Sequence, residues 1–418
     1  MIQSLSLIFP IAVIFCLINH RLFKLPSSIA LVISGAAVAI SILLLQNFFP
    51  SLREFAVGTL DTVDFGSILL DGFLGFLLFA GAIHIDLRQL DVSKWSILAF
   101  STVSVLITAT LVGAVTFYLA PLVGVEIPFV YCLLFGALIS PTDPVAVLAI
   151  LGDSKISDSL LVKFKGESLF NDGIGVVLFA GVLLVIKMTN DGSFDGIYSE
   201  VGWLLLKEIG GGLMLGALIG FIAFQAIKYA SGAHQLVTMI SLAAVVGGYS
   251  VAQFLHVSGP LAMVVAGLII GNQLHLEDEI NESHEVLTSF WEMISETLDA
   301  IVFFMIGLSI TSVQFSWNTS ILGVLVIILV LAARFVSIYT PYSLLKHDSQ
   351  HRLSIATILT WGGLRGAVSI ALVLGTTDMD YSNTLLVLTF FVVIFGIVVQ
   401  GLTIGKVYRS LFKNDTMP

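Results

Sequence analysis

Long apolar runs recur along the whole chain, and they constrain the fold more than any other feature. Each run holds about 20 residues, which is enough to cross a bilayer as a helix. Of the 418 residues, 57% are hydrophobic and 11% are charged, whereas a soluble domain carries about 25% charged residues. A soluble enzyme is therefore excluded. We expect an all-α polytopic membrane protein in which residues 1–418 form a single transmembrane domain.

The charge balance and the cysteines exclude several classes of partner. The formal net charge is −10, whereas a nucleic-acid-binding domain carries a basic footprint, so no nucleic acid is expected to bind. Cys16 and Cys132 lie in apolar runs, which indicates buried apolar side chains rather than a disulfide or metal site. The sequence has no His-Glu-x-x-His metal motif. We expect no cofactor, no enzymatic activity, and lipid as the surrounding medium.

Hydropathy predicts about thirteen spans. No basic residue precedes the first run and no small-residue cleavage site follows it, so we interpret it as a retained helix rather than a signal peptide. The spans are expected near residues 2–19, 27–48, 65–84, 95–120, 127–151, 166–187, 201–228, 234–255, 259–274, 290–311, 317–342, 353–375 and 382–407.

Basic residues are divided unevenly between alternate gaps, and this predicts the orientation. Of the 18 Lys and Arg residues, Arg53, Lys187 and Lys207 lie on one side of the predicted membrane. Arg334 and Arg365 lie within spans, and all the others lie on the opposite side. Because positive residues stay in the cytoplasm, we expect the N-terminus outside and the C-terminus inside, in the plasma membrane.

Two spans are broken, at matching places in two six-span blocks. We expect a first repeat at 1–187, a connecting helix at 201–228, a second repeat at 234–407 and a short cytoplasmic tail at 408–418. An odd number of spans separates the blocks, so the repeats would be inverted. The breaks are Ile139-Ser-Pro-Thr-Asp-Pro-Val145 and Trp361-Gly-Gly-Leu-Arg-Gly366. Crossed broken helices in inverted repeats indicate a transport site near the membrane midplane.

Each break carries one charge. Asp143 precedes Pro144, which suits an N-cap followed by the first helical residue. Arg365 lies where a half-helix ends, and the exposed carbonyls of such an end attract a cation. We therefore expect Asp143 and Arg365 to neutralise the half-helix ends where the two spans cross; direct ion binding by these residues is the alternative.

The sixth span carries Asp172 about two turns from its start, with no basic residue within one helical turn. Charged groups inside a membrane are costly and are functional candidates by default. Ser168 lies four residues earlier, on the same helix face, and can add an oxygen ligand. Asp172 is thus a candidate to hold either a proton or a dehydrated cation.

The Thr142-Asp143-Pro144 break, the segment from Glu167 to Asp172 and the Gly363-Leu364-Arg365-Gly366 break together resemble the monovalent cation:proton antiporter family 1. That family includes bacterial NhaP-type sodium/proton antiporters. The resemblance implies that Asp172 carries Na⁺ or a proton, that Ser168 and Thr142 are further Na⁺ ligands, and that Asn171 orients the site. It also implies a buried ion pair between Glu167 and Arg334, a bacterial plasma membrane, a core packed beside dimerisation helices, and a homodimer.

Some features depart from that family or fit it less clearly. Many relatives carry a Glu in the third span where this chain has Ala80, so cation affinity or selectivity is expected to differ. Asp71 is expected to line the outer approach, and the role of Asp299 stays open. The acidic segment 275–296 is a candidate pH sensor or, alternatively, a solvated loop. Three small residues spaced by four, Gly212, Gly216 and Gly220, predict close helix packing, within the subunit or, alternatively, at a dimer seam.

The expected function is exchange of cytoplasmic Na⁺ or Li⁺ for external H⁺. Because Asn171 leaves one carboxylate at the helix site, we expect electroneutral 1:1 exchange by alternating access. A K⁺/H⁺ antiporter of the same fold is the main alternative. A cation channel would favour a continuous polar pore, and an intramembrane aspartyl protease would need a Gly-x-Gly-Asp segment, which the sequence lacks.

Overall fold

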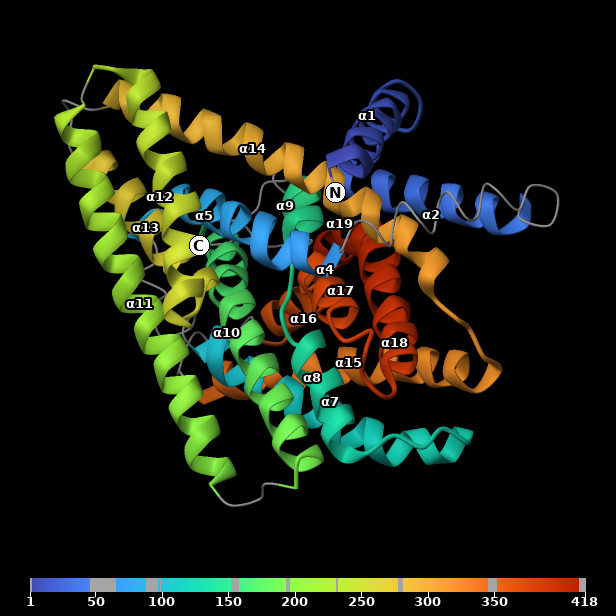
Figure 1. Ribbon diagram of the computed structural model, residues 1–418. Helices are drawn as coiled ribbons and strands as arrows, with labels where there is room; N and C mark the ends of the chain where they lie inside the picture. Colours follow the sequence, from blue (N-terminus) through green and yellow to red (C-terminus); the bar gives the residue numbers. More distant parts are fainter. Residues whose placement is uncertain are drawn as a thin grey trace. The chain divides into compact units, whose positions relative to one another are not determined.

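The computed structural model describes residues 2–45, 65–87, 97, 99–151, 158–192, 196–230, 232–276, 281–344 and 352–412. Within these ranges the regular structure is helical and contains no strand (Figure 1). The expectation of an all-α membrane protein is confirmed.

The helices fall into two compact units, and each unit is described by itself. Unit 1 comprises residues 1–70, 106–157 and 298–418, and unit 2 comprises residues 71–105 and 158–297. Unit 1 contains α1 (Ile2–Ile18), α2 (Ser27–Leu45), α4 (Phe65–Ser67), most of α7 (Ser104–Leu119), α8 (Phe129–Ile139), α9 (Val145–Leu151), α15 (Trp317–Leu344), α16 (Arg352–Gly362), α17 (Ala367–Leu374), α18 (Ser382–Ile394) and α19 (Gly401–Leu411). Unit 2 contains α5 (Leu74–Ile83), α10 (Asp158–Asn190), α11 (Ile197–Tyr229), α12 (His234–Leu255), α13 (Gly259–Leu276) and the first part of α14 (Asn281–Leu308).

Membrane spans account for most of these helices. In the part of the chain that the structure describes, ten helical segments are long and apolar enough to cross a membrane, and the bent pair α16 and α17 makes an eleventh. The count of about thirteen is therefore not confirmed. The two remaining predicted spans correspond to shorter apolar helices, α8 and α13. The fifth span is short because Pro141 and Pro144 remove backbone donors and divide it, which leaves α8 and α9 as two pieces.

Among the described residues, four segments form π-helices that hydropathy did not predict. They are Asn19–Phe23, Ile68–Phe73, Ala99–Val103 and Phe395–Gln400. A π turn adds one residue to a helical turn and often occurs at a functional site. A single extra residue does not interrupt an apolar run, so hydropathy cannot reveal it.

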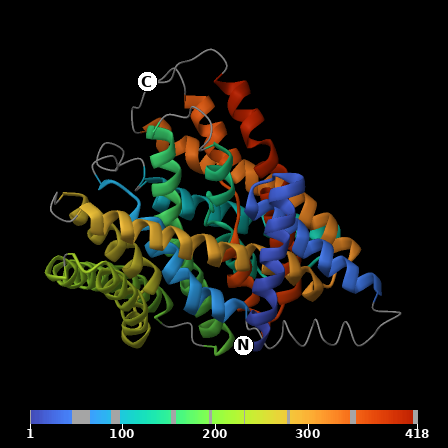
Figure 2. The ribbon, with the colours of Figure 1, turned by 90° about the horizontal axis from the view of Figure 1, so that it is seen from above.

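Glycines pack α13 tightly between α5 and α11 in unit 2. Figures 1 and 2 show α11 and α13 side by side. A Cβ at Gly216 would overlap the backbone of Ala262, and Gly212 and Gly220 lie similarly against α13. On its other side, α13 brings Gly271 against the backbone of Ile83 in α5. The prediction that the glycine face packs within the subunit is confirmed.

An apolar cluster around Trp291 fills the centre of unit 2. Trp291 is fully buried and donates a hydrogen bond from Nε1 to Ser241 Oγ at 3.1 Å. Its ring lies 4.6 Å from that of Phe79, measured between centroids. Ala80 belongs to the same cluster and is buried. Ala80, where the sequence analysis expected a departure from the family, therefore lies in apolar packing.

If successive spans cross the membrane in alternating directions, some helix ends must lie on the same side of it. Hydrogen bonds join several such ends. Gln253, near the end of α12, donates to Asp71, near the start of the third predicted span, at 2.8 Å. At the opposite end of that span, Asn272 donates to the carbonyl of Ile85 at 2.8 Å. In unit 1, Asn383 donates to the carbonyl of Gln314 at 2.9 Å. All three contacts agree with spans that alternate in direction.

Candidate functional site

The first broken span begins its second half-helix at an aspartate cap. Helix α8 ends at Ile139, residues 140–144 are not helical, and α9 starts at Val145. The backbone N–H of Val145 donates to Asp143 Oδ1 at 2.9 Å. This bond satisfies one of the donors that a helix start leaves without an intrahelical partner. Asp143 thus holds the N-terminal end of its own half-helix.

The second broken span meets the first directly. Helix α16 ends at Gly362, α17 starts at Ala367, and the two are bent by 49°. The backbone N–H of Asp143 donates to the carbonyl of Leu364 at 2.8 Å. Because this bond joins one break to the other, the two irregular segments satisfy each other's backbone groups, as irregular backbone inside a membrane requires.

Arg365 holds the C-terminal end of α8. Its side chain is 2% exposed. Nη1 donates to the carbonyls of Ser140 at 2.6 Å and Pro141 at 2.8 Å. These carbonyls follow the negative end of the α8 dipole, so a guanidinium there is electrostatically favourable.

Asp143 also faces the start of α17. Gly366 is the N-cap residue of that half-helix. A Cβ at Gly366 would overlap the carboxyl group of Asp143, with Oδ2 as the nearest atom. The carboxyl therefore occupies the space in which an N-cap side chain would lie. A single carboxylate thus serves the positive ends of two half-helices, which the sequence did not predict.

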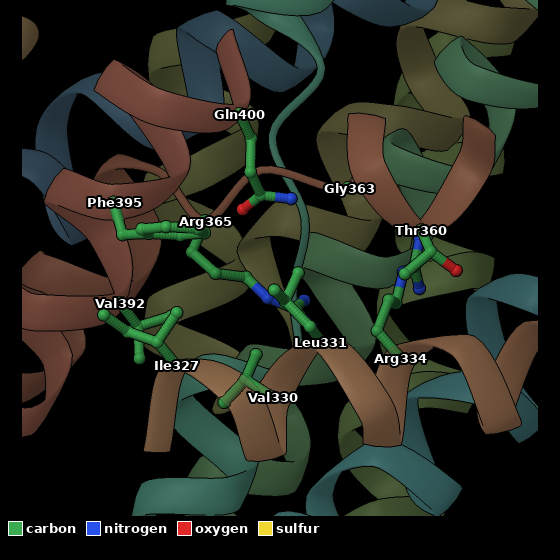
Figure 3. Close-up of a pocket in the computed structure, with 10 residues that line it drawn as sticks. All are labelled: Ile327, Val330, Leu331, Arg334, Thr360, Gly363, Arg365, Val392, Phe395 and Gln400. Atoms are coloured by element: carbon green, nitrogen blue, oxygen red, sulfur yellow. The ribbon is translucent and has the colours of Figure 1, made fainter. Parts of the chain in front are cut away.

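A small cavity beside the second break is lined by two arginines, and it has room for about one water molecule. Arg334 on α15 and Arg365 both line it, together with Thr360 and Gln400 (Figure 3). Arg334 is 2% exposed, and a Cβ at Gly363 would lie 2.8 Å from its Nε. The absence of a side chain at Gly363 therefore leaves the space that Arg334 occupies.

Gln400 holds the C-terminal end of α16, and sequence analysis missed this residue. Its Nε2 donates to the carbonyl of Trp361 at 2.9 Å. Trp361 Nε1 in turn donates to Thr403 Oγ1 at 2.9 Å. Gln400 ends the π-helix Phe395–Gln400, and it is a polar residue within an otherwise apolar run. That isolated polarity was the signal that could have revealed it.

The predicted carrier residues lie together on α10 in unit 2. Asp172 is half-buried, whereas Glu167, Ser168 and Asn171 are buried. Asp172 and Ser168 share a helix face, being four residues apart. Thr142, Asp143, Arg334 and Arg365 belong to unit 1, where the structure brings Asp143 and Arg365 to the crossing and Arg334 to the cavity beside it. The Asp172–Thr142 and Glu167–Arg334 pairings join different units and remain predictions.

The remaining candidate residues lie neither at the breaks of the two broken spans nor in the group of predicted carrier residues on α10. Asp71 is exposed and bonded to Gln253, and Asp299 is half-buried on α14. Glu285, Glu292 and Glu296 are exposed along α14. Residues 277–280 of the acidic segment lie outside the described residues, as do Arg53, Arg88, Lys94 and Lys155 of the orientation argument and residues 413–418 of the tail.

Comparison with known proteins identifies the family. The family described as sodium/hydrogen exchanger, transmembrane, matches residues 9–409. This chain belongs to the sodium/hydrogen exchanger family. The exchanger is 36% identical over 405 residues to the Na⁺/H⁺ antiporter NhaP of Pseudomonas aeruginosa, covering 96% of this chain and 94% of that protein.

Two further comparisons agree with that assignment. The exchanger is 30% identical to the Na⁺/H⁺ antiporter NhaH of Halobacillus aidingensis, covering 94% of this chain and 93% of that protein. Its fold matches that of the sodium proton antiporter MjNhaP1 from Methanocaldococcus jannaschii with a TM-score of 0.76, at 19% sequence identity and over 99% of both chains. At that identity the structural likeness shows the fold alone.

Proposed function

We propose that this exchanger moves Na⁺ or Li⁺ out of the cytoplasm in return for external H⁺ by alternating access. The observation that carries the proposal is the crossing of the two broken helices, bonded through Asp143 to Leu364 and through Arg365 to Ser140 and Pro141. Such a crossing supplies fixed, neutralised helix ends near which a dehydrated ion can lie. The names of the relatives, Na⁺/H⁺ antiporters, give the ions.

Asp172 is the proposed carrier, with Ser168 and Thr142 as further Na⁺ ligands and Asn171 orienting the site. A carboxylate and hydroxyl oxygens are the hard ligands that a small monovalent cation prefers. The half-buried position of Asp172 beside buried Ser168 and Asn171 supports this role. The buried Glu167 and Arg334 are proposed as the structural ion pair, because neither is expected to stay charged alone in a membrane.

The proposed stoichiometry is one proton for one cation. One carboxylate exchanges one bound proton for one bound Na⁺. The two positive helix ends that Asp143 faces favour its charged form, and no change of charge is proposed at either arginine, because a guanidinium keeps its proton in proteins. The net charge moved per cycle is then zero. A valinomycin-clamped potential that drives Na⁺ accumulation in proteoliposomes without a pH gradient would contradict this.

The proposed assembly rests on the resemblance to the family, and the proposed orientation rests on the distribution of basic residues. We propose a homodimer in a bacterial plasma membrane, which is the inner membrane if the cell is Gram-negative. The N-terminus lies outside and the C-terminus inside, as the distribution of basic residues predicts. Protease protection of tags at each end in sealed vesicles tests the orientation.

The decisive test is transport by purified protein in proteoliposomes with an imposed pH gradient. Na⁺ and Li⁺ are expected to dissipate the gradient, and K⁺ in their place would favour the K⁺/H⁺ alternative. Asp172→Asn is expected to abolish exchange while the protein stays folded and inserted. The matched control is Asp191→Asn, the same change at an exposed position just beyond α10. Cation-dependent proton flux through the Asp172→Asn variant would refute the carrier assignment.

A further inference from the structure

Two buried hydroxyls of unit 1, those of Thr116 and Ser369, have no hydrogen-bond partner among the described residues, and Ser369 is the one that lies on a broken span. Ser369 on α17 is 1% exposed. Many buried hydroxyls instead donate to a carbonyl one turn earlier. Ser309 Oγ donates to Ile306 O at 3.0 Å, and Thr389 Oγ1 donates to Leu385 O at 2.7 Å. A buried polar atom left without such a bond points to a water or ion that fills the place.

Ser369 lies at the end of α17 that faces Asp143. With Gly366 as N-cap, Ser369 is the third residue of the half-helix. An N-cap side chain lies over the second and third residues of its helix. Because the Asp143 carboxyl occupies the space of the side chain that Gly366 lacks, the carboxyl and Ser369 belong to the same small region at the start of α17.

The two oxygens of Asp143 differ in their roles. Oδ1 accepts the hydrogen bond from Val145, whereas Oδ2 is the oxygen nearest to Gly366. Nη1 of Arg365 is directed to the carbonyls of Ser140 and Pro141. A hydroxyl is both a donor and an acceptor, so Ser369 can donate to Oδ2 or present its own lone pairs beside it. A carboxylate oxygen next to a hydroxyl oxygen is a ligand pair suited to a hard monovalent cation.

We propose that Ser369 is a cation-positioning residue of this exchanger. Its hydroxyl oxygen, beside Asp143 Oδ2, contacts the transported monovalent cation at the start of α17, and a water takes that place when the cation has left. This deepens the proposed function and rests on it, because it assumes that a monovalent cation reaches the crossing. It places this contact on the two broken spans, at residues that both belong to unit 1.

The test compares Ser369→Ala with Ser309→Ala in proteoliposomes. We expect the KM for Na⁺ to rise roughly 3- to 10-fold in Ser369→Ala, the equivalent of one lost polar contact, with little change in maximal rate. Ser309→Ala, which removes an equally buried hydroxyl bonded within its own turn, is expected to keep the wild-type KM. Ser369→Thr retains the hydroxyl and is expected to restore most of the affinity.

Melting temperatures in detergent separate this role from a structural one. Removing a merely buried hydroxyl is expected to leave the Na⁺-induced rise in melting temperature unchanged, whereas removing a cation contact reduces that rise. If Ser369→Ala does not survive purification, Ser369→Cys replaces it, and its KM and Na⁺-induced rise in melting temperature are compared with those of Ser309→Ala. A thiol has a similar size to a hydroxyl and is a poor ligand for Na⁺.

The outcomes are distinct. An unchanged KM together with an unchanged Na⁺-induced rise in Ser369→Ala, or in Ser369→Cys in its place, overturns the inference. If wild type and Ser309→Ala themselves show no cation-dependent proton flux, the proposed function fails instead.

Discussion

In both breaks of this exchanger the charged end of a half-helix dipole is neutralised, but by side chains of opposite charge. The first break carries Asp143, whose carboxyl caps α9 and occupies the N-cap space of α17. The second carries Arg365, which binds the carbonyl end of α8. Each break therefore neutralises an end of the other. The inverted repeats expected from the sequence did not imply this reciprocity, because each charge lies on only one of the two breaks.

The two C-terminal half-helix ends show the sharpest difference. Arg365 donates to the carbonyls that follow α8, whereas the neutral amide of Gln400 donates to the carbonyl of Trp361 at the end of α16, with the Arg334 guanidinium beside Gly363. Charge-assisted hydrogen bonds are roughly twice as strong as neutral ones. The bonds of Arg365 are thus expected to contribute more than the bond of Gln400. Substitutions at Arg365, Gly366 and Gln400 test this ranking.

The largest effect is expected for Arg365→Gln. The change leaves the carbonyls of Ser140 and Pro141 without the two charge-assisted bonds of Nη1. At about 1.5–3 kcal/mol each, their loss is expected to lower the free energy of unfolding by roughly 3–6 kcal/mol and to abolish exchange. Thermal melting in detergent and proton flux in proteoliposomes measure both effects.

The matched control for that change is Arg409→Gln, at an exposed position on α19. It is expected to leave melting and flux near wild-type values. Equal melting temperatures for Arg365→Gln and Arg409→Gln would show that the guanidinium does not hold the end of α8.

Gly366→Ala tests the reciprocal contact and is expected to have an intermediate effect. A Cβ at this position would overlap the Asp143 carboxyl, and overpacking of this kind costs about 1–3 kcal/mol. The carboxyl would have to move away from the start of α17, so exchange is expected to fall further than stability. Gly375→Ala at the other end of α17 places its Cβ no closer than 3.4 Å to a neighbouring atom, and it should behave like wild type. If Gly366→Ala exchanges at the wild-type rate, transport does not depend on contact between the Asp143 carboxyl and the start of α17.

The contrast between the breaks also shows how far the sequence can be read. Apolar runs and prolines predicted the spans and the division of the fifth span, because membrane length and missing backbone donors act locally. The charge of Asp143 predicted the start of the half-helix that it caps, whereas Arg365 was expected at the half-helix that ends beside it and instead binds the carbonyls that follow α8. No pattern predicted that the Asp143 carboxyl would replace a side chain at Gly366, because that contact joins segments more than 200 residues apart.

Gln400 was missed for a related reason. Its role depends on the π turn that ends at this residue, and one extra residue leaves no trace in an apolar run. Ser369 was also missed, because a serine near the start of a half-helix has no distinctive sequence signal. That its hydroxyl lacks a hydrogen-bond partner is recognised only when the hydrogen bonds of other buried hydroxyls are known.

The smallest effect is expected for Gln400→Leu, and it measures how weakly the end of α16 is held. The change removes one neutral hydrogen bond, from Nε2 to the carbonyl of Trp361. Such a bond contributes about 0.5–1.5 kcal/mol, so the melting temperature is expected to fall by less than in Arg365→Gln or Gly366→Ala.

The ion site itself keeps its charges in this variant, so the KM for Na⁺ should stay near the wild-type value. Turnover, which requires the half-helix to keep its position, is expected to change more. The control is Gln225→Leu, the same substitution at an exposed position of α11, which is expected to alter neither melting nor turnover. If Gln400→Leu melts as low as Arg365→Gln, the two half-helix ends are held equally firmly, and the contrast between a charged and a neutral clamp is wrong.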